Sequence, residues 1–275
     1  MSTLHTFIDR TSDRGSAFAG ALASSDLHER TPAAFAQTAF EGTSPRYVFL
    51  STACVLETLA QAGFLPVAAA QTRTSAERRL HARHAIRLRR RYEYVALKDT
   101  IPELLLVNGH DGRTATQLRV ALFRVVCTNG LIVSMGDLSV WRFPHRGAIL
   151  DDVAQAALAQ AELFSEVGAH VERMERTVLE EPQRLEFAER ALALRYPEGR
   201  QGGMHPSQLL AVRREADVGH DLWRTYNCVQ ENLLKGGLTR RSPSNRLSQT
   251  RAITAIKEGI RLNTALWEMA MALAA

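Results

Sequence analysis

The chain has 275 residues, of which 45% are hydrophobic and 23% are charged, an ordinary globular composition that suits one large domain or two smaller ones. No stretch reaches the roughly 18–20 uninterrupted apolar residues of a membrane helix, and Asp9 and Asp13 stand where a signal peptide would need an apolar run. These features exclude a membrane partner and predict a cytoplasmic protein.

The net charge of +5 is distributed unevenly along the chain. Residues 73–91 contain eight arginines and a single acid, Glu77. Residues 235–257 contain six basic residues and no acid, whereas residues 151–198 hold eleven acids and five bases. Two basic zones therefore flank an acidic one, a pattern that points to a polyanionic partner.

Residues 1–45 are rich in Ser, Thr, Gly and Ala and predict an N-terminal arm, partly extended or disordered, in which Thr31-Pro32 opens a short helical turn. Ser51 or Thr52 then caps a helix that ends at Gly63. The apolar stripe of this helix consists of Val55, Leu56, Leu59 and Ala60.

Three strands are expected next, at residues 65–74, 82–97 and 103–109. In the second strand, alternation places four arginines on one face and apolar or aromatic side chains on the other. The first set is Arg83, Arg87, Arg89 and Arg91, and the second is Ile86, Leu88, Tyr92 and Tyr94. Residues 117–134 are apolar enough for either a helix or strands, and Asn129-Gly130 is a turn dipeptide that would join two strands.

From residue 150 the spacing of apolar residues becomes helical. Helices are expected at 150–196, with a second start at Pro182, then near 207–217, around Trp223 to Leu233, and at 248–272. The fold class is therefore α+β, with a small antiparallel sheet of three to five strands. The expected regions are the arm at 1–45, an α+β core with the basic strand at 46–145, and a helical region at 146–275.

The arginine-rich strand is the strongest chemical signal. Arginine forks match phosphate oxygens and stack on bases, so charge beside tyrosines suits nucleic acid. A solvated edge strand kept basic against edge pairing is the alternative, although that role needs only one or two charges. The expected contacts in this half of the chain are Arg83, Arg87, Arg89, Arg91, Tyr92 and Arg113.

Residues 235–251 form the second basic segment and predict a flexible Gly/Ser/Pro loop that tracks a phosphate backbone. An ordinary solvated loop is the alternative reading. The expected contacts are Lys235, Arg240, Arg241 and Arg246.

Other chemistry has weaker signals. His110-Asp111 lies in the turn Asn108-Gly109-His110-Asp111-Gly112, where turn capping is favoured over a metal site because the other histidines lack ligand spacing. Three scattered cysteines predict buried thiols. No nucleophile motif, P-loop or dinucleotide fingerprint is present, so no catalytic residue, metal or cofactor is expected.

The segment 223–237, WRTYNCVQENLLKGG, combines aromatic and polar residues. Trp223 and Tyr226 are expected to pack in the core. Some of its four polar side chains are expected to hydrogen-bond at an interdomain or interprotomer contact. These are Asn227, Gln230, Glu231 and Asn232.

Three ordered motifs carry a resemblance that runs from about residue 33 to 273. They are SPRYVFLSTACVLETLAQAGFLPVAAAQTRT, VNGHDGRTATQLRVALFRVVCTNGLIVS and DLWRTYNCVQENLLKGG. With these the chain resembles the domain-of-unknown-function 932 family, uncharacterised proteins frequently carried on plasmids and prophages. The family pattern would read Asn-Ser-His-Asp-Gly-Ser where this chain has Gly109 and Arg113. By fold analogy alone, a helix beside a sheet with a basic strand also looks like the core of phage single-strand annealing proteins.

The leading hypothesis is a non-enzymatic protein that binds single-stranded nucleic acid, DNA rather than RNA, and anneals or recombines it on a mobile element. It would act as a homo-oligomeric ring or filament. One alternative is a metal-dependent nuclease or phosphohydrolase that uses His110 and Asp111. Another is a protein-interaction module that counters host defence, in which the acidic helices and the Trp223 region bind a protein.

Overall fold

The computed structural model describes residues 21–91, 100–124, 130–132, 140–143, 150–197, 201–242 and 244–274. The chain divides into two compact units, Met1–Leu131 with Met135–Phe164 and Ile132–Ser134 with Ser165–Ala275. The first unit thus extends beyond the boundary at residue 145 that the sequence predicts, because the helix at 150–162 packs on the sheet. Among the described residues, no helix combines the length and the apolar character needed to span a membrane.

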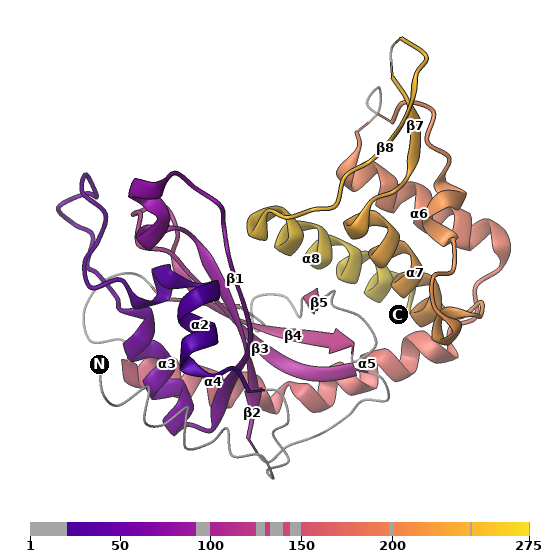
Figure 1. The fold of residues 1–275 in the computed structure, drawn as a ribbon. Helices are drawn as coiled ribbons and strands as arrows, with labels where there is room; N and C mark the ends of the chain where they lie inside the picture. The colour runs from indigo at the N-terminus through magenta and orange to yellow at the C-terminus, as the bar shows by residue number, and fades with distance from the viewer. Residues whose placement is uncertain are drawn as a thin grey trace. The chain divides into compact units, whose positions relative to one another are not determined.

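A six-stranded sheet forms the centre of the first unit (Figure 1). Its order is β1-β2-β3-β4-β5, and β6 also pairs with β4. Antiparallel ladders join β1 to β2, β2 to β3, β3 to β4 and β4 to β6. The strands are β1 (Phe64–Gln71), β2 (His84–Arg90), β3 (Thr100–Asn108), β4 (Thr116–Arg124), β5 (Gly130–Ile132) and β6 (Val140–Phe143).

The predicted alternation of strand β2 is confirmed. Ile86 and Leu88 are fully buried, whereas Arg83, Arg87 and Arg89 are half-buried on the other face. The segment that the sequence left ambiguous contains strands β4 and β5, because its β-branched and apolar residues fill a sheet that is buried on both faces at its centre. Tyr92, Tyr94 and Asn129 lie outside the described residues.

Two helices cover one face of this sheet. Helix α3 (Thr52–Gln61) begins at Ser51, whose hydroxyl accepts from the Cys54 amide as a cap, and packs on β1. Helix α4 (Leu150–Glu162) packs on β3 and β4, and the Gln160 side-chain amide donates to the backbone oxygen of Leu118. The predicted apolar stripe of α3 is buried in this layer.

The N-terminal arm is more ordered than the sequence predicts. Helix α2 (Ser24–Arg30) and the 3-10 turn η1 (Pro32–Phe35) occupy residues 24–35, and the turn at Pro32 is confirmed. Leu27 is fully buried, so apolar contact with the sheet fixes this segment despite its Ser- and Ala-rich composition. A second 3-10 turn, η2 (Ala76–His81), replaces the simple polar turn expected between β1 and β2. Residues 1–20 lie outside the described part.

The second unit is mostly helical, which together with the sheet of the first unit confirms the α+β class. Its core surrounds Tyr226 and Trp267, both fully buried, with their rings edge to face at 5.9 Å. The elements are α5 (Phe164–Arg176), α6 (Glu181–Arg195), η3 (Pro206–Leu210), η4 (Glu215–Asp217), α7 (Leu222–Lys235), β7 (Thr239–Arg241), β8 (Leu247–Gln249) and α8 (Ile256–Leu273).

Two helices predicted in this unit differ from the structure. The segment near 207–217 holds only the short turns η3 and η4. The last helix begins at Ile256 instead of residue 248, because residues 247–249 pair with 239–241 as a hairpin. The loop expected at 235–251 therefore contains regular structure.

Candidate nucleic-acid interface

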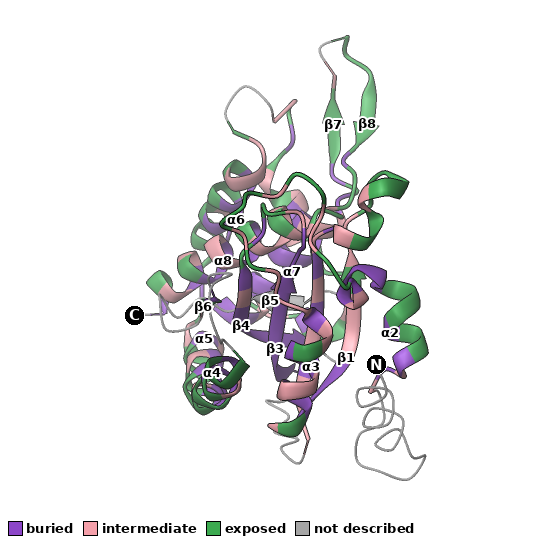
Figure 2. Cartoon of the chain, turned by 90° about the vertical axis from the view of Figure 1, so that its left-hand side faces the viewer, coloured by how far each residue is buried: buried purple, intermediate pink, exposed green. Residues whose placement is uncertain are grey.

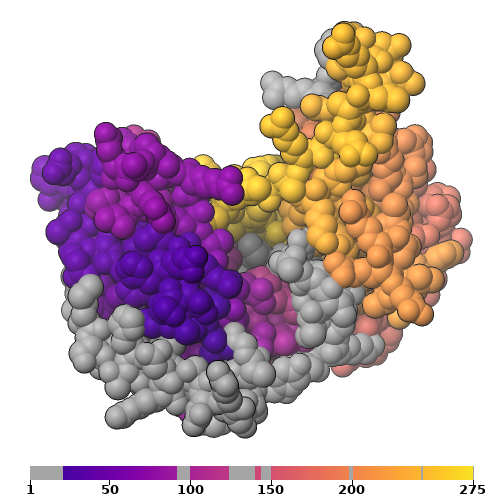
Figure 3. All heavy atoms as spheres, in the orientation of Figure 1, coloured from indigo at the N-terminus to yellow at the C-terminus, as the bar shows by residue number. Residues whose placement is uncertain are grey.

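The hairpin β7–β8 is the most exposed regular structure of the second unit. Its register pairs Arg240 with Ser248 and Arg241 with Leu247. All six strand residues are exposed, as Figure 2 shows by their colour. In the space-filling view the hairpin stands out from the helices that carry it (Figure 3).

Cationic side chains occupy both faces of this hairpin. Successive residues of a strand point to opposite faces, so Arg240 and Arg241 are presented in opposite directions. Arg246 follows the turn, where Asn245 has a φ of 60° and accepts from the Arg241 guanidinium at 3.1 Å. Among the described residues, no carboxylate pairs with any of these three arginines. The hairpin is therefore an exposed cationic ribbon.

The base of the hairpin is fixed by hydrogen bonds. Gly237 donates to the backbone oxygen of Thr250, whose amide donates in turn to Leu238. The Gln208 side chain both accepts from and donates to the backbone of Thr239, at 2.7 Å and 3.1 Å. At Gly236, with a φ of 71°, an added Cβ would lie 2.7 Å from the Thr250 oxygen, so only glycine fits. These bonds anchor both strands of the hairpin at its base.

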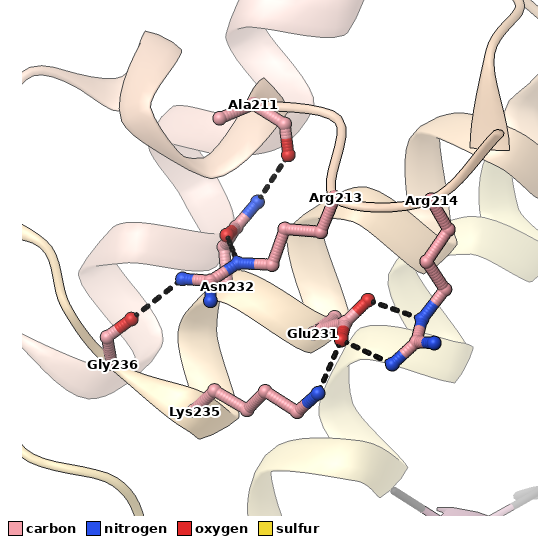
Figure 4. Close-up of polar contacts among 7 residues, drawn as sticks. All are labelled: Ala211, Arg213, Arg214, Glu231, Asn232, Lys235 and Gly236. Atoms are coloured by element: carbon pink, nitrogen blue, oxygen red, sulfur yellow. Dashed lines mark hydrogen bonds and ion pairs between the residues drawn. The ribbon is translucent and has the colours of Figure 1, made fainter. Parts of the chain in front are cut away.

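A polar cluster around the buried Glu231 and Asn232, at the end of α7, supports that base (Figure 4). Asn232 donates to the backbone oxygens of Leu209 and Ala211 and accepts from Arg213. The Arg213 guanidinium also donates to the Gly236 oxygen at 2.9 Å. This arginine therefore links helix α7 to the first residue after it, where the chain turns into the hairpin.

Glu231 lies beside Asn232 and binds two cations, Arg214 at 2.7 Å and Lys235. Burial raises the pKa of Glu231, but the hydrogen bonds from Arg214 and Lys235 outweigh it and hold the pKa below its usual value. Lys235, predicted as a nucleic-acid contact, is thus paired with this carboxylate.

The polar residues of α7 therefore have a different role from the one expected. Trp223 and Tyr226 pack in the core as predicted. The four polar side chains, however, bond within the second unit, since Asn227 donates to the Trp223 oxygen and Gln230 to Asn263. These bonds do not form the predicted interdomain contact. All four residues are buried.

The arginines of β2 have a different setting. Arg87 Nε donates to Glu103 Oε2 at 2.8 Å, and Arg89 Nη2 donates to Oε1 at 2.8 Å. The Glu103 side chain is completely buried, and the Arg87 guanidinium also stacks 3.4 Å from the Phe123 ring centroid. Two guanidiniums share one carboxylate, so a single net positive charge is left at this point of the sheet.

The remaining predicted contacts of the first unit lie apart from this cluster. Arg83 Nε donates to the Thr114 hydroxyl at 3.1 Å, and Arg91 is half-buried just beyond the end of β2. Arg113 is exposed in the turn after β3, where its amide donates to Asp111. Tyr92 lies outside the described residues. Of the predicted residues that the structure describes, only Arg240, Arg241 and Arg246 lie together on one exposed hairpin.

The turn that contains His110 and Asp111 joins a buried hydrogen-bond network. The Thr52 hydroxyl lies 2.9 Å from His84 Nε2 and 3.2 Å from His110 Nε2, and it accepts from the Asn108 amide at 2.8 Å. Asn108 in turn accepts from the Thr116 hydroxyl at 2.8 Å. The network therefore ties helix α3 to strands β2, β3 and β4.

The proton positions in this network follow from its geometry. His84 Nδ1 lies 2.9 Å from the Ala82 carbonyl oxygen and must donate to it, so the Nε2 of a neutral ring accepts from the Thr52 hydroxyl. The second lone pair of Thr52 then accepts from His110 Nε2. Burial lowers the pKa of His84 to about 4, against a smaller opposing contribution from the Ala82 carbonyl. His84 is consequently neutral at physiological pH.

This arrangement favours a structural role for the turn. Asp111 accepts from the Arg113 amide at 3.0 Å, the side-chain turn capping that the sequence favours. Across the described part of the chain, no group of three or more His, Cys, Asp or Glu is placed to hold a metal ion. Cys228 is buried as expected, whereas Cys54 is exposed on α3, contrary to the prediction, and Cys127 lies outside the described residues.

Two residues central to these sites were missed by the sequence reading. Glu103 interrupts the apolar run of β3, and an acid inside a buried strand is a signal that a cation must lie opposite it. Arg213 has no such signal in the sequence, because its partners are the Asn232 side chain and the Gly236 backbone oxygen at the end of helix α7.

Together these features define an α+β protein with a sheet unit and a helical unit, the latter carrying an exposed cationic hairpin. The chain belongs to the family described as Domain of unknown function (DUF932), which it matches over residues 39–267. It is 37% identical over 255 residues to UPF0380 protein YafZ of Escherichia coli (strain K12), covering 92% of this chain and 91% of that protein. UPF0380 protein YfjQ of the same strain is 36% identical over 252 residues, with 90% of each covered. No solved structure matches.

Proposed function

We propose that this protein binds single-stranded nucleic acid through the hairpin β7–β8. The observation that carries the proposal is the set of three exposed arginines on a rigidly based ribbon, in a segment from residue 235 to 257 that contains no acid. Binding of this kind is driven by phosphate neutralisation and depends steeply on salt.

A single strand suits this hairpin because charge and an apolar surface lie side by side. Leu247 is 65% exposed and stands directly opposite Arg241. Unstacked bases offer flat faces to arginine planes and apolar side chains, whereas the bases of a duplex are covered by their neighbours. Annealing or recombination by a ring or filament of copies would follow from such binding and belongs to the same proposal.

The two alternative functions receive less support from the described residues. A metal-dependent nuclease would need further ligands beside His110 and Asp111, but the described residues form no group of three or more such ligands, and the buried His110 bonds to Thr52. A protein-binding surface at Trp223 would need that ring exposed, but it is 5% exposed and stacks on Tyr226. The hairpin is therefore the feature that favours a function most clearly.

The test is fluorescence anisotropy of a labelled single-stranded oligonucleotide titrated with three proteins. These are the natural chain, the hairpin variant Arg240→Ala/Arg241→Ala/Arg246→Ala, and a charge-matched control, Arg30→Ala/Arg173→Ala/Arg190→Ala, whose three sites are exposed. We expect the hairpin variant to bind at least about tenfold more weakly while the control binds like the natural chain. Equal weakening in both variants would show a general charge effect, and equal binding by all three proteins would refute the proposal. A duplex of the same sequence is expected to bind more weakly than the single strand.

A further inference from the structure

The sheet of the first unit contains a buried arginine without an acidic partner. Arg119, on β4, is 9% exposed. Its Nε and Nη2 both donate to one oxygen, Gln117 Oε1, at 3.0 Å and 2.8 Å. Among the described residues, no carboxylate lies within ion-pair distance of this guanidinium. Arg87 and Arg89 on the same sheet face show the contrasting solution, since both bind Glu103.

A second cation, Arg142, stands near Arg119 on the adjacent strand. Arg142 on β6 stands directly opposite Gln117, and Arg119 stands opposite Val140. Both arginines therefore lie on one face of the sheet as diagonal neighbours, about 7–8 Å apart along the ladder. Burial, and then the charge of Arg142, lower the pKa of Arg119. Arg142 itself is exposed, and no described carboxylate pairs with it.

Burying a cation beside a second cation is unfavourable unless an anion offsets both charges. Gln117 orients Arg119 by holding one edge of its guanidinium, which leaves the Nη1 edge without a bond to any described residue. A planar fork of this kind matches the oxygens of a phosphate in a two-point interaction, and a second guanidinium can reach a third oxygen.

We propose that Arg119, Arg142 and Gln117 form a phosphate-binding site on strands β4 and β6. Arg119 provides the buried fork, Gln117 fixes its orientation, and Arg142 closes the site from the solvent side. The ligand is a phosphate oxyanion, either free or in the backbone of a nucleic acid. The site is separate from the proposed function of the hairpin, because none of its three residues belongs to the hairpin.

The first test is thermal unfolding of the full chain in inorganic phosphate and in chloride at matched ionic strength. The variant is Arg142→Ala, an exposed position where folding should be retained, and the control is Arg30→Ala on α2. Without phosphate, Arg142→Ala is expected to raise the Tm, since it removes a repulsion. In phosphate, the natural chain and the control are expected to gain Tm, and Arg142→Ala is expected to lose that gain. Arg119→Gln, which removes the buried charge, should also raise the Tm without phosphate and lose the gain of Tm in phosphate.

The second test distinguishes the two sources of phosphate. If inorganic phosphate shifts the Tm of the natural chain but not of Arg142→Ala, the site takes a free phosphate group. If inorganic phosphate has no effect, the same variants are titrated with a single-stranded oligonucleotide. A loss of affinity of at least tenfold in Arg142→Ala but not in Arg30→Ala then assigns the site to a nucleic-acid backbone. The proposal is overturned if Arg142→Ala changes neither the gain of Tm in phosphate nor the affinity for the oligonucleotide.

Discussion

Strand β2 and the hairpin β7–β8 are both rich in arginine, yet their side chains are used differently. On β2, Arg87 and Arg89 converge on the buried carboxylate of Glu103. On the hairpin, Arg240, Arg241 and Arg246 are exposed and meet no described carboxylate. Arg87 and Arg89 therefore stabilise the sheet. The three hairpin arginines remain available for a partner.

The difference teaches that the density of arginines along a chain does not by itself locate a binding surface. Residues 73–91 contain more arginines than the hairpin segment and were the stronger signal. One acid on the neighbouring strand decides their environment, because a buried carboxylate is stabilised by hydrogen bonds from the cations beside it. The availability of a cation thus depends on residues distant in sequence.

The largest expected effect comes from removing that acid. Glu103→Gln leaves Arg87 and Arg89 close together without a countercharge, and we expect the free energy of unfolding to fall by about 3–5 kcal/mol. Chemical denaturation measures the loss, with the exposed Glu77→Gln as the control. A loss below about 1 kcal/mol would show that the Glu103 cluster contributes little, and would weaken the contrast between β2 and the hairpin.

The next effect concerns the buried network of Thr52, His84 and His110. The pKa of His84 is lowered to about 4 in the folded chain, from an ordinary value near 6.5. Because the unfolded chain takes up this proton and the folded chain does not, stability is lost as pH falls from about 6.5 to about 4, by roughly 3 kcal/mol.

Denaturation at several pH values measures this loss, and the variant is His84→Gln, which has no titrating ring. Its stability is expected to fall less on acidification than that of the natural chain. The exposed His220→Gln is the matched control and should keep the natural pH dependence. Equal acid sensitivity in all three proteins would contradict the assignment.

A smaller loss is expected at the base of the hairpin. Asn232→Ala removes two hydrogen bonds to Leu209 and Ala211 and the acceptor for Arg213, and it should lower the free energy of unfolding by about 2 kcal/mol. Gln155→Ala, on the exposed side of α4, serves as the control. We also expect Asn232→Ala to bind the oligonucleotide more weakly under conditions where the variant is still folded, since the hairpin loses its anchored base. An unchanged affinity would show that the base does not orient the ribbon.

The smallest expected effect on stability is that of the hairpin variant Arg240→Ala/Arg241→Ala/Arg246→Ala. Exposed side chains without buried contacts change the free energy of unfolding by about 0.5 kcal/mol or less. Circular dichroism during denaturation checks this value. A loss comparable to that of Glu103→Gln would mean that the hairpin arginines are structural as well, and the two regions would no longer differ.

Local patterns explain which parts of this fold the sequence could predict. Strand β2 and helix α3 follow from alternation and from the stripe of Val55, Leu56, Leu59 and Ala60, because period and burial agree there. The hairpin could not be predicted from periodicity, since all six of its strand residues are exposed and none marks a buried face.

The same limit applies to the candidate sites. The exposed arginines could be named from composition, but not separated from Arg87 and Arg89 without knowing that Glu103 lies beside them. The Arg119 and Arg142 pair was invisible in the sequence for the same reason, since 23 positions separate two residues that the β4–β6 ladder brings together. Long-range strand pairing is not contained in any local pattern.

The most direct test of the central claim is the salt dependence of single-strand binding in the natural chain and in the hairpin variant. For single strands, the slope of log affinity against log salt is about −0.7 for each phosphate neutralised. If the three hairpin arginines contact phosphates, the slope should become shallower by about 2 in the hairpin variant and stay unchanged in Arg30→Ala/Arg173→Ala/Arg190→Ala. An unchanged slope in the hairpin variant would place the phosphate contacts elsewhere on the protein.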